Sequence, residues 1–291
     1  MKVWLNGKII DARDAKVSLF DRGFLYGDGV FETMRAYGGA VFMLEDHLAR
    51  LKGSLALCRI SIGRRFGAIA PALERLLEMN RLKEASVRVN VSRGEGRFGI
   101  GAKDRPSPTV AVTAQRFLPL PRRMHERGIS AGIVRDVRLN GCSPLSGIKS
   151  SNYLLHIIAR MEAEAAGFDE AILLNARGVV AEAATSNIFA VCGRKVVTPP
   201  LAGGILPGVT RKAVLALAGA CGFSCEEKEI TRRALGESDE VFLTNSLFEI
   251  LPVTSIDRSS IGDGKVGPVT ALLRGRYRKL ARRGTEAPTR E

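Results

Sequence analysis

The sequence lacks any long apolar run. Its longest candidate, residues 214–223, is about half as long as the roughly 18–20 residues of a membrane-spanning helix. The first residues, MKVWLNG, also lack the apolar stretch of a signal peptide. Because 45% of the residues are apolar and 25% are charged, the composition is that of a folded globular protein. We therefore expect no membrane partner and predict a cytoplasmic location.

Cysteine and histidine are both scarce. The five cysteines are odd in number and scattered, so they do not form the framework of a disulfide-rich domain. Cys221 and Cys225 are four residues apart, but no histidine lies nearby to complete a tetrahedral zinc site. The sequence therefore predicts no metal site and a reducing compartment, which agrees with the cytoplasm.

Acidic residues are outnumbered by basic ones, 30 to 44, which gives a net charge of +14. Such an excess is compatible with nucleic-acid binding, which depends on basic patches. However, the basic residues are spread along the chain, with one cluster at 274–283, and no aromatic-interleaved RNA-binding motif occurs. We favour a basic surface that attracts anionic small molecules. A nucleic-acid-binding protein remains the remote alternative, and no nucleic-acid partner is predicted.

The periodicity of apolar residues predicts an α+β protein of two domains. In the first part we expect strands at 2–6, 8–10, 29–37, 40–44, 87–92 and 109–114, and helices at 45–57 and 68–79. In the second we expect strands at 129–135, 170–175, 179–191, 240–244 and 251–253, and helices at 151–166 and 209–221. Two prolines in FLPLPRR (117–123) interrupt regular structure. They predict a small α/β domain at 1–117, a linker at 118–124 and a larger β-rich domain at 125–291.

A lysine stands immediately before one predicted helix, in SGIKSSNY (146–153). Ser150, Ser151 and Asn152 all favour N-cap positions, and the positive end of a helix lowers the pKa of a nearby ammonium group. A lysine with a lowered pKa can act as an amine nucleophile or form a Schiff base. Lys149 is therefore a candidate for such chemistry, although the segment alone fits an ordinary solvated lysine better.

Two further segments are candidates for binding an anionic, ring-containing ligand. GGILPGVTR (203–211) leads into a helix whose first backbone N–H groups and Thr210 hydroxyl can bind an anion, although a plain Gly-Pro turn is the simpler interpretation. The turn TNS (244–246) can supply further donors. Glu182 lies among apolar and small residues, where a carboxylate needs a partner such as a protonated ring nitrogen. A glutamate facing solvent on an edge strand is the alternative.

Together, these segments resemble the class IV, or fold type IV, pyridoxal-phosphate enzymes. This group contains branched-chain aminotransferases, D-amino-acid aminotransferases and 4-amino-4-deoxychorismate lyases. The resemblance extends from about Trp4 to Val253. The matching segments are DRGFLYGDGVFETMR (21–35), LEDHLARL (44–51), SRGEGRFG (92–99), GIKSSNYL (147–154), DEAILLNARGVVAEAATSNIF (169–189), TPPLAGGILPGVTR (198–211) and FLTNSLFEILPV (242–253).

The resemblance implies a two-domain fold type IV enzyme that holds pyridoxal 5′-phosphate through an imine with Lys149, which also moves the α-proton. It implies that Glu182 pairs with the ring nitrogen and that Tyr153 bonds the cofactor's phenolic oxygen. The implied phosphate-binding residues are Arg50, Val209, Thr210 and Ser246. Tyr26 and Phe31 are implied to line the substrate pocket, which the loop at 93–99 borders. Family members are usually homodimers, so a homodimer is expected.

The same resemblance implies the reaction. We rank first a transaminase that moves an amino group between a branched-chain L- or D-amino acid and a 2-oxo acid such as 2-oxoglutarate. The loop SRGEGRFG is similar to that of branched-chain enzymes, but FET (31–33) and TSN (185–187) favour the lyases and the D-amino-acid enzymes. The Arg-x-His carboxylate site of the D-specific enzymes would align with Phe98 and Ile100, and Arg97 can replace it only in part. A lyase that releases 4-aminobenzoate and pyruvate is the alternative.

Overall fold

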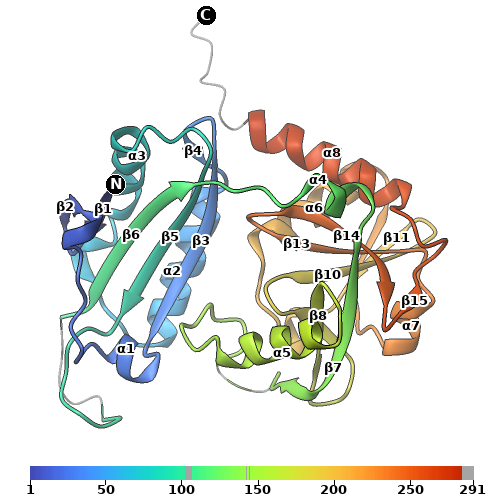
Figure 1. Ribbon diagram of the computed structural model, residues 1–291, viewed down its shortest axis with the longest axis horizontal. Coiled ribbons are helices and arrows are strands. Elements are labelled where there is room, and N and C mark those ends of the chain that lie inside the picture. The colour runs from blue at the N-terminus through green and yellow to red at the C-terminus, as the bar shows by residue number, and fades with distance from the viewer. Residues whose placement is uncertain (102–106, 142, 144, 284–291) are drawn as a thin grey trace, which may run out of the picture. The chain divides into compact units, whose positions relative to one another are not determined.

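The computed structural model describes residues 1–101, 107–141, 143 and 145–283 (Figure 1). The chain forms two compact units. Unit 1 contains Met1–Leu118, Ile148–Asn152 and, of the described residues at the end of the chain, 281–283. Unit 2 contains Pro119–Gly147 and Tyr153–Leu280. The two domains predicted on either side of the linker at 118–124 remain a prediction, because compact units need not fold independently. The short segment Ile148–Asn152 returns to unit 1, although the residues on either side of it belong to unit 2.

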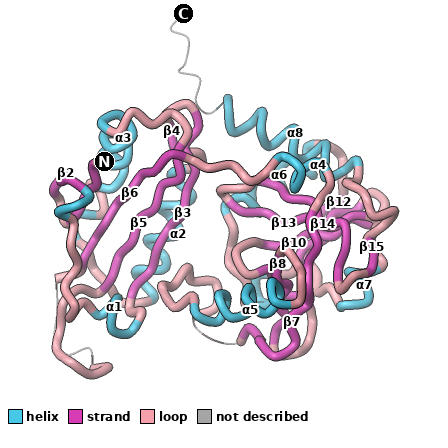
Figure 2. The backbone as a smooth tube through the Cα atoms, viewed as in Figure 1, coloured by secondary structure: helices cyan, strands magenta, loops and turns pink. Residues whose placement is uncertain are grey.

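Unit 1 is an antiparallel sheet with helices on one face (Figure 2). Its strands follow the order β2-β1-β6-β5-β3-β4. Their bounds are β1 (Lys2–Leu5), β2 (Lys8–Asp11), β3 (Gly29–Tyr37), β4 (Ala40–Val41), β5 (Ala85–Ser92) and β6 (Thr109–Arg116). The helices are α1 (Arg22–Tyr26), α2 (Leu44–Leu57) and α3 (Ile69–Met79), with 3-10 turns at Ala12–Asp14 and Gly63–Arg65.

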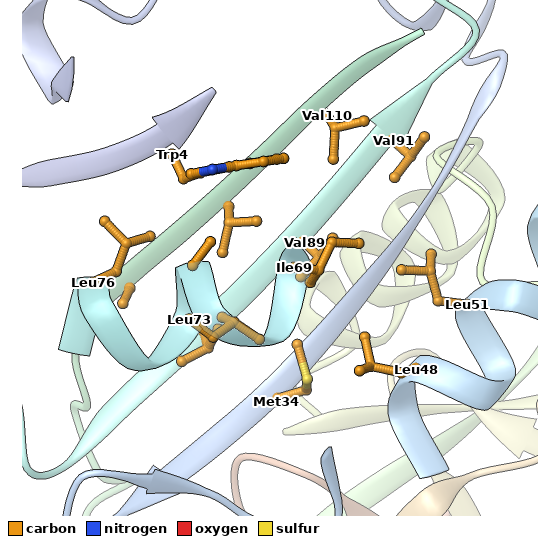
Figure 3. Close-up of a cluster of buried hydrophobic side chains, with 14 of the residues drawn as sticks. Trp4, Met34, Leu48, Leu51, Ile69, Leu73, Leu76, Val89, Val91 and Val110 are labelled. Carbon is orange, nitrogen blue, oxygen red and sulfur yellow. The ribbon is translucent and has the colours of Figure 1, made fainter. Parts of the chain in front are cut away.

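Alternating apolar residues on the central strands form the core of unit 1. On β5, every second side chain is a fully buried valine: Val87, Val89 and Val91. Side chains of α2 and α3 pack on this face together with Trp4 and Met34 (Figure 3). The helices bury one apolar stripe each, because residues three or four apart share a helix face. The packed core and the pairing with β5 therefore hold β3 firmly in place.

Unit 2 is a mixed sheet that curls on itself. Its strand order is β12-β11-β10-β13-β14-β7-β8-β9, and β15 pairs with β14. The strands are β7 (Ile129–Leu139), β8 (Glu170–Asn175), β9 (Val180–Ala183), β10 (Asn187–Cys192), β11 (Lys195–Thr198), β12 (Ser224–Glu227), β13 (Glu240–Asn245), β14 (Glu249–Ile256) and β15 (Ser259–Ser260). Strand β9 is at one end of this order, and β10 is near the other end. A tight turn nevertheless joins them, so the sheet must curl to bring the two strands together.

Helices and turns complete unit 2. They are α4 (Arg122–Glu126), α5 (Leu154–Ala165), the 3-10 turn Leu201–Gly203, α6 (Val209–Ala220), α7 (Arg232–Gly236) and α8 (Pro268–Arg283). No helix among the described residues is long and apolar enough to cross a membrane. Within the same residues, no group of three or more histidine, cysteine, aspartate or glutamate side chains is arranged to hold a metal ion.

The predicted α+β class is confirmed, and most predicted elements are present. Several predicted boundaries are wrong. The strand expected at 179–191 is two strands, β9 and β10, because the chain turns at 184–186. The strands expected at 129–135 and 251–253 extend to 129–139 and 249–256. The strand expected at 40–44 ends at Val41, because the chain turns at Met43 (φ 52°) into α2. The helix expected from residue 151 begins at Leu154, because the preceding residues pair with a strand of unit 1.

Candidate active site

Lys149 lies on a short extended segment at the edge of β3 in unit 1. The Phe31 N–H donates to Lys149 O at 2.9 Å, and the Ser151 N–H donates to Gly29 O at 2.9 Å. Val30 and Ser150 form the antiparallel bridge between these bonds. The Lys149 ammonium nitrogen lies 4.7 Å from the centre of the Phe31 ring. The backbone of the lysine is therefore held by a rigid strand, while its side chain lies against an aromatic face.

The helix-end explanation for Lys149 is wrong. Helix α5 begins at Leu154, and its N-cap residue is Tyr153, which makes no side-chain capping bond. The helix dipole acts mainly within the first turn, and Lys149 precedes α5 by five residues. Instead of capping, the Asn152 amide donates to Gly27 O at 3.2 Å. The polar residues after the lysine therefore anchor it to unit 1.

Arg50 on α2 is held by a buried acid on β3. Its Nε donates to Glu32 Oε1 at 2.8 Å, and its Nη2 donates to Glu32 Oε2 at 2.7 Å. His47, one turn earlier on α2, lies with Nδ1 2.8 Å from Glu32 Oε2. Glu32 is 0% exposed and His47 is 2% exposed. These three polar groups join β3 to α2, and we call them the Glu32 cluster.

Electrostatics fix the protonation states in the Glu32 cluster. Burial acts to raise the pKa of Glu32, but hydrogen bonds from Arg50 and His47 outweigh it and place the pKa below its ordinary value of 4.5. Burial lowers the pKa of His47 below 6.5, against the hydrogen bond to Glu32, and the charges of Arg50 and Lys149 lower it further. Glu32 is therefore ionised and His47 neutral near pH 7. Because a carboxylate only accepts, Nδ1 carries the proton of His47.

The three residues predicted to line a substrate pocket have different surroundings. Phe31 is buried on β3 and, besides Lys149, the Arg88 guanidinium lies 3.8 Å from its ring centre. The Tyr26 hydroxyl on α1 accepts a hydrogen bond of 2.8 Å from the Gly99 N–H. Arg97 is exposed on the same loop as Gly99. Unit 1 therefore brings Phe31 to Lys149, and Tyr26 to the loop that carries Arg97.

Glu182 is buried on β9 in unit 2, with 8% of its surface exposed. Its Oε2 accepts hydrogen bonds from the Leu206 N–H at 3.1 Å and from the Asn187 amide at 3.3 Å. The same Asn187 amide donates to Leu206 O at 2.9 Å. The alternative of a solvent-facing glutamate is wrong, because neighbouring polar groups surround the carboxylate inside the unit.

The start of α6 lies beside Glu182, because Asn187 and Leu206 connect the two. Gly208 is its N-cap residue and, having no side chain, leaves the first backbone N–H groups uncapped by a side chain. Val209 and Thr210 are both buried, and the Thr210 hydroxyl lies 3.4 Å from the Tyr277 hydroxyl. This end of a 12-residue helix presents backbone N–H groups and a hydroxyl, the donors that suit a phosphate.

A second turn of unit 2 lies at the same end of the sheet. Thr244 on β13 stands opposite Asn187 on β10, so the turn that carries Ser246 follows close to the Glu182 region. The Asn245 amide donates to Thr185 O at 3.3 Å, which ties this turn to the one after β9. The Thr244 and Ser186 hydroxyl oxygens are buried without a hydrogen-bond partner in the described part of the chain. Such unpaired hydroxyls are suited to a polar ligand.

Tyr153 is the N-cap residue of α5, and its ring stacks on that of His156 at 4.7 Å between ring centres. It belongs to unit 2, whereas Lys149 belongs to unit 1. Sequence reasoning missed four residues: Glu32, His47, Asn187 and Tyr277. An acid inside the strand pattern GVFETMRAY was the available signal for Glu32, and the spacing of three residues to Arg50 was the signal for His47. Nothing local in the sequence indicates Asn187 or Tyr277.

Comparison with known proteins identifies the family. The amino-transferase class IV family model matches residues 29–256. A putative branched-chain-amino-acid aminotransferase of Methanocaldococcus jannaschii is 39% identical over 280 residues, with 96% of each chain covered. D-alanine aminotransferase of Bacillus licheniformis is 35% identical, with 93% of each chain covered. Aminodeoxychorismate lyase of Bacillus subtilis is also 35% identical, covering 95% of this chain and 94% of the lyase.

The fold is similar to that of solved enzymes of this group. Superposition on the branched-chain amino acid aminotransferase of Escherichia coli has a TM-score of 0.93 at 29% identity, and it covers 99% of this chain and 96% of the other. Another branched-chain amino acid aminotransferase, solved with pyridoxamine 5′-phosphate, superposes with a TM-score of 0.92. The family match spans more than half of the 291 residues, as the motifs predicted. The chain is therefore an enzyme that belongs to the class IV aminotransferase family.

Proposed function

We propose that this enzyme is a pyridoxal-phosphate-dependent transaminase that moves an amino group between an amino acid and a 2-oxo acid. The observation that carries the proposal is the position of Lys149, whose backbone is held at the edge of β3 and whose ammonium group lies over Phe31. A strand holds the backbone of a catalytic group more firmly than a loop does, which favours reaction by fixing its orientation.

The side chains present fit this cofactor by their chemistry. Lys149 supplies the amine, and the buried Glu182 carboxylate supplies a partner for a protonated ring nitrogen. Thr210 and the uncapped N–H groups of α6 suit a phosphate, with Arg50 and Ser246 as further candidates. The unpaired buried hydroxyls of Ser186 and Thr244 also favour a polar ligand in unit 2. When bound, pyridoxal phosphate supplies an aldehyde that takes up amines and a ring that accepts electrons from the α-carbon.

Each residue then has a separate task. The Lys149 Nζ would take the proton from the substrate α-carbon and deliver it to the cofactor carbon that keeps the amino group. Its long side chain can move between these positions while its backbone stays paired to β3. Phe31 excludes water from one side of this amine. Glu182 holds a proton at the ring nitrogen, and Asn187 and the Leu206 N–H keep its carboxylate oriented. Tyr153 is proposed to bond the phenolic oxygen.

A branched-chain L-amino acid or a D-amino acid is the proposed donor, and 2-oxoglutarate an acceptor. The M. jannaschii and B. licheniformis relatives support these two classes. Tyr26, Phe31 and Arg97 are the proposed substrate-binding residues. The lyase that releases 4-aminobenzoate and pyruvate is the second candidate, and the B. subtilis relative supports it.

An absorbance measurement tests the cofactor. The purified enzyme should show a band at about 410–420 nm, which is absent from Lys149→Ala and present in Lys8→Ala, a change of an exposed lysine of the same unit. A colourless wild type that stays inactive with added cofactor would refute the proposal. Glutamate formation from 2-oxoglutarate with L- and D-amino donors, set beside pyruvate release from aminodeoxychorismate, separates the two reactions.

We also propose a cytoplasmic homodimer. Exposed apolar side chains of unit 1 at Leu19, Phe24 and Phe98 support a partner surface. The free cysteines of the described chain support a reducing compartment, and Cys142 lies outside the described residues. Sedimentation equilibrium should give twice the chain mass of 31.4 kDa. A single-chain mass at all concentrations would contradict the dimer.

A further inference from the structure

Both carboxylate oxygens of Glu32 have hydrogen-bond partners within the Glu32 cluster. Oε1 accepts from Arg50 Nε, while Oε2 accepts from Arg50 Nη2 and lies 2.8 Å from the protonated Nδ1 of His47. A guanidinium that is bonded through Nε and Nη2 has its plane and its rotation fixed together. Neither of these two bonds uses Nη1 of Arg50. The cluster therefore determines the orientation of the whole guanidinium group.

Stability alone is a poor reason for this arrangement. Glu32 stands on the same face of β3 as Val30, Met34 and Ala36, which belong to the apolar core. Burying an ion pair in such a place costs about as much desolvation as the pairing returns, and an apolar set of similar volume is often as stable. The cluster is therefore better explained by the orientation that it imposes on Arg50 than by a contribution to folding.

We propose that Glu32 and His47 are positioning residues, which hold the Arg50 guanidinium in the orientation in which it binds the phosphate of the cofactor. This inference rests on the proposed function. Glu32 fixes the guanidinium by two bonds, and His47 fixes Glu32 by a third. His47 stays neutral beside the positive charges of Arg50 and Lys149, so it orients the carboxylate without adding a further charge.

Binding of two probes to the full-length chain, freed of cofactor, tests this role. Pyridoxal phosphate and pyridoxal differ only by the phosphate, so the ratio of their dissociation constants reports on the phosphate site. For Glu32→Gln and His47→Leu, we expect the dissociation constant of pyridoxal phosphate to rise about tenfold or more, as for a lost charged hydrogen bond. The dissociation constant of pyridoxal should change by less than about threefold.

Three controls separate positioning from a structural role. His47→Asn keeps a donor near the position of Nδ1 and should retain most of the wild-type ratio. In an Arg50→Ala background, Glu32→Gln should have no further effect on the ratio, because it acts through the arginine. Leu76→Ala destabilises the core of unit 1 far from the cluster and should leave the ratio unchanged.

The outcomes distinguish this inference from the proposed function. If the wild type binds neither probe, the proposed function fails and the inference fails with it. If the wild type binds pyridoxal phosphate but Glu32→Gln and His47→Leu keep its ratio, only the positioning role is overturned. If Glu32→Gln does not fold, His47→Leu and His47→Asn decide: equal ratios in these two variants overturn the inference, and a loss restricted to leucine supports it.

Discussion

Replacing Gly208 by alanine should disturb the surroundings of Glu182 without straining the backbone. Gly208 has φ −65° and ψ 132°, which any residue adopts, so its lack of a side chain must be explained by space. An alanine Cβ at this place would lie 3.2 Å from Asn187 Cγ and from Arg211 Cβ, and it would overlap the Asn187 side-chain oxygen. Carbon atoms settle at about 3.5–4.0 Å, so the Asn187 amide must turn away.

The size of the effect follows from what Asn187 gives up. Its side-chain amide donates hydrogen bonds to Leu206 O at 2.9 Å and to Glu182 Oε2 at 3.3 Å. Forcing a well-packed side chain from its place costs about 1–3 kcal/mol, and leaving a buried acceptor unpaired costs about 1–3 kcal/mol more. Together these costs are about 2–6 kcal/mol, and at about 2–4 °C per kcal/mol for a unit of this size the melting temperature should fall by roughly 4–24 °C.

Scanning calorimetry of Gly208→Ala measures this loss, and Gly219→Ala is the matched control. Gly219 lies on the same helix with open space at its Cβ position, so alanine should stabilise there by up to about 1 kcal/mol. With Asn187→Ala in the background, Gly208→Ala should cost little, because the overlapping amide is gone. A Gly208→Ala protein that melts within about 2 °C of the wild type would refute the steric reasoning.

Two further predictions concern unit 2. Burial, followed by the charges of Arg274 and Arg278, lowers the pKa of His125 from 6.5 to about 4. The neutral imidazole therefore contributes stability that is fully present above pH 6.5 and is lost as the pH falls toward 4. Between pH 7 and pH 5, the urea midpoint should fall more for the wild type than for His125→Gln, and equal shifts would contradict the assignment. The Glu240 carboxylate accepts hydrogen bonds from the N–H groups of Val269 and Thr270 in the first turn of α8. Glu240→Ala should therefore lower the free energy of unfolding by about 1–2 kcal/mol and speed amide hydrogen exchange in α8. Unchanged exchange would argue against this cap.

Local chemistry was enough to predict many elements. Asn6 and Gly7 both have positive φ, 50° and 98°, as the two-residue hairpin between β1 and β2 requires, and the Asn-Gly pair indicates that turn directly. The apolar spacing of residues 68–79 likewise predicted α3 to within one residue. These features depend on neighbours in sequence, so the sequence pattern carries them.

Features that depend on distant partners were not predictable in the same way. The polar residues after Lys149 suggested a helix cap, but their backbone pairs with Gly29 and Phe31, and no local pattern shows such pairing. The burial of Glu182 followed from its apolar neighbours, whereas its bond to the Leu206 N–H required the tertiary structure. The roles assigned to the site residues from the family motifs stay predictions, which the experiments above test.

The return of Ile148–Asn152 to unit 1 has a consequence for synthesis on the ribosome. β3 emerges early, but the backbone groups of Gly29 and Phe31 on its outer edge find their partners only about 120 residues later in the chain. Until then, a nascent chain exposes an open strand edge, the kind of edge to which other chains pair. A fragment that stops at Leu118 keeps this edge open and also lacks Lys149. Completing the sheet of unit 1 and placing Lys149 beside β3 are therefore one event.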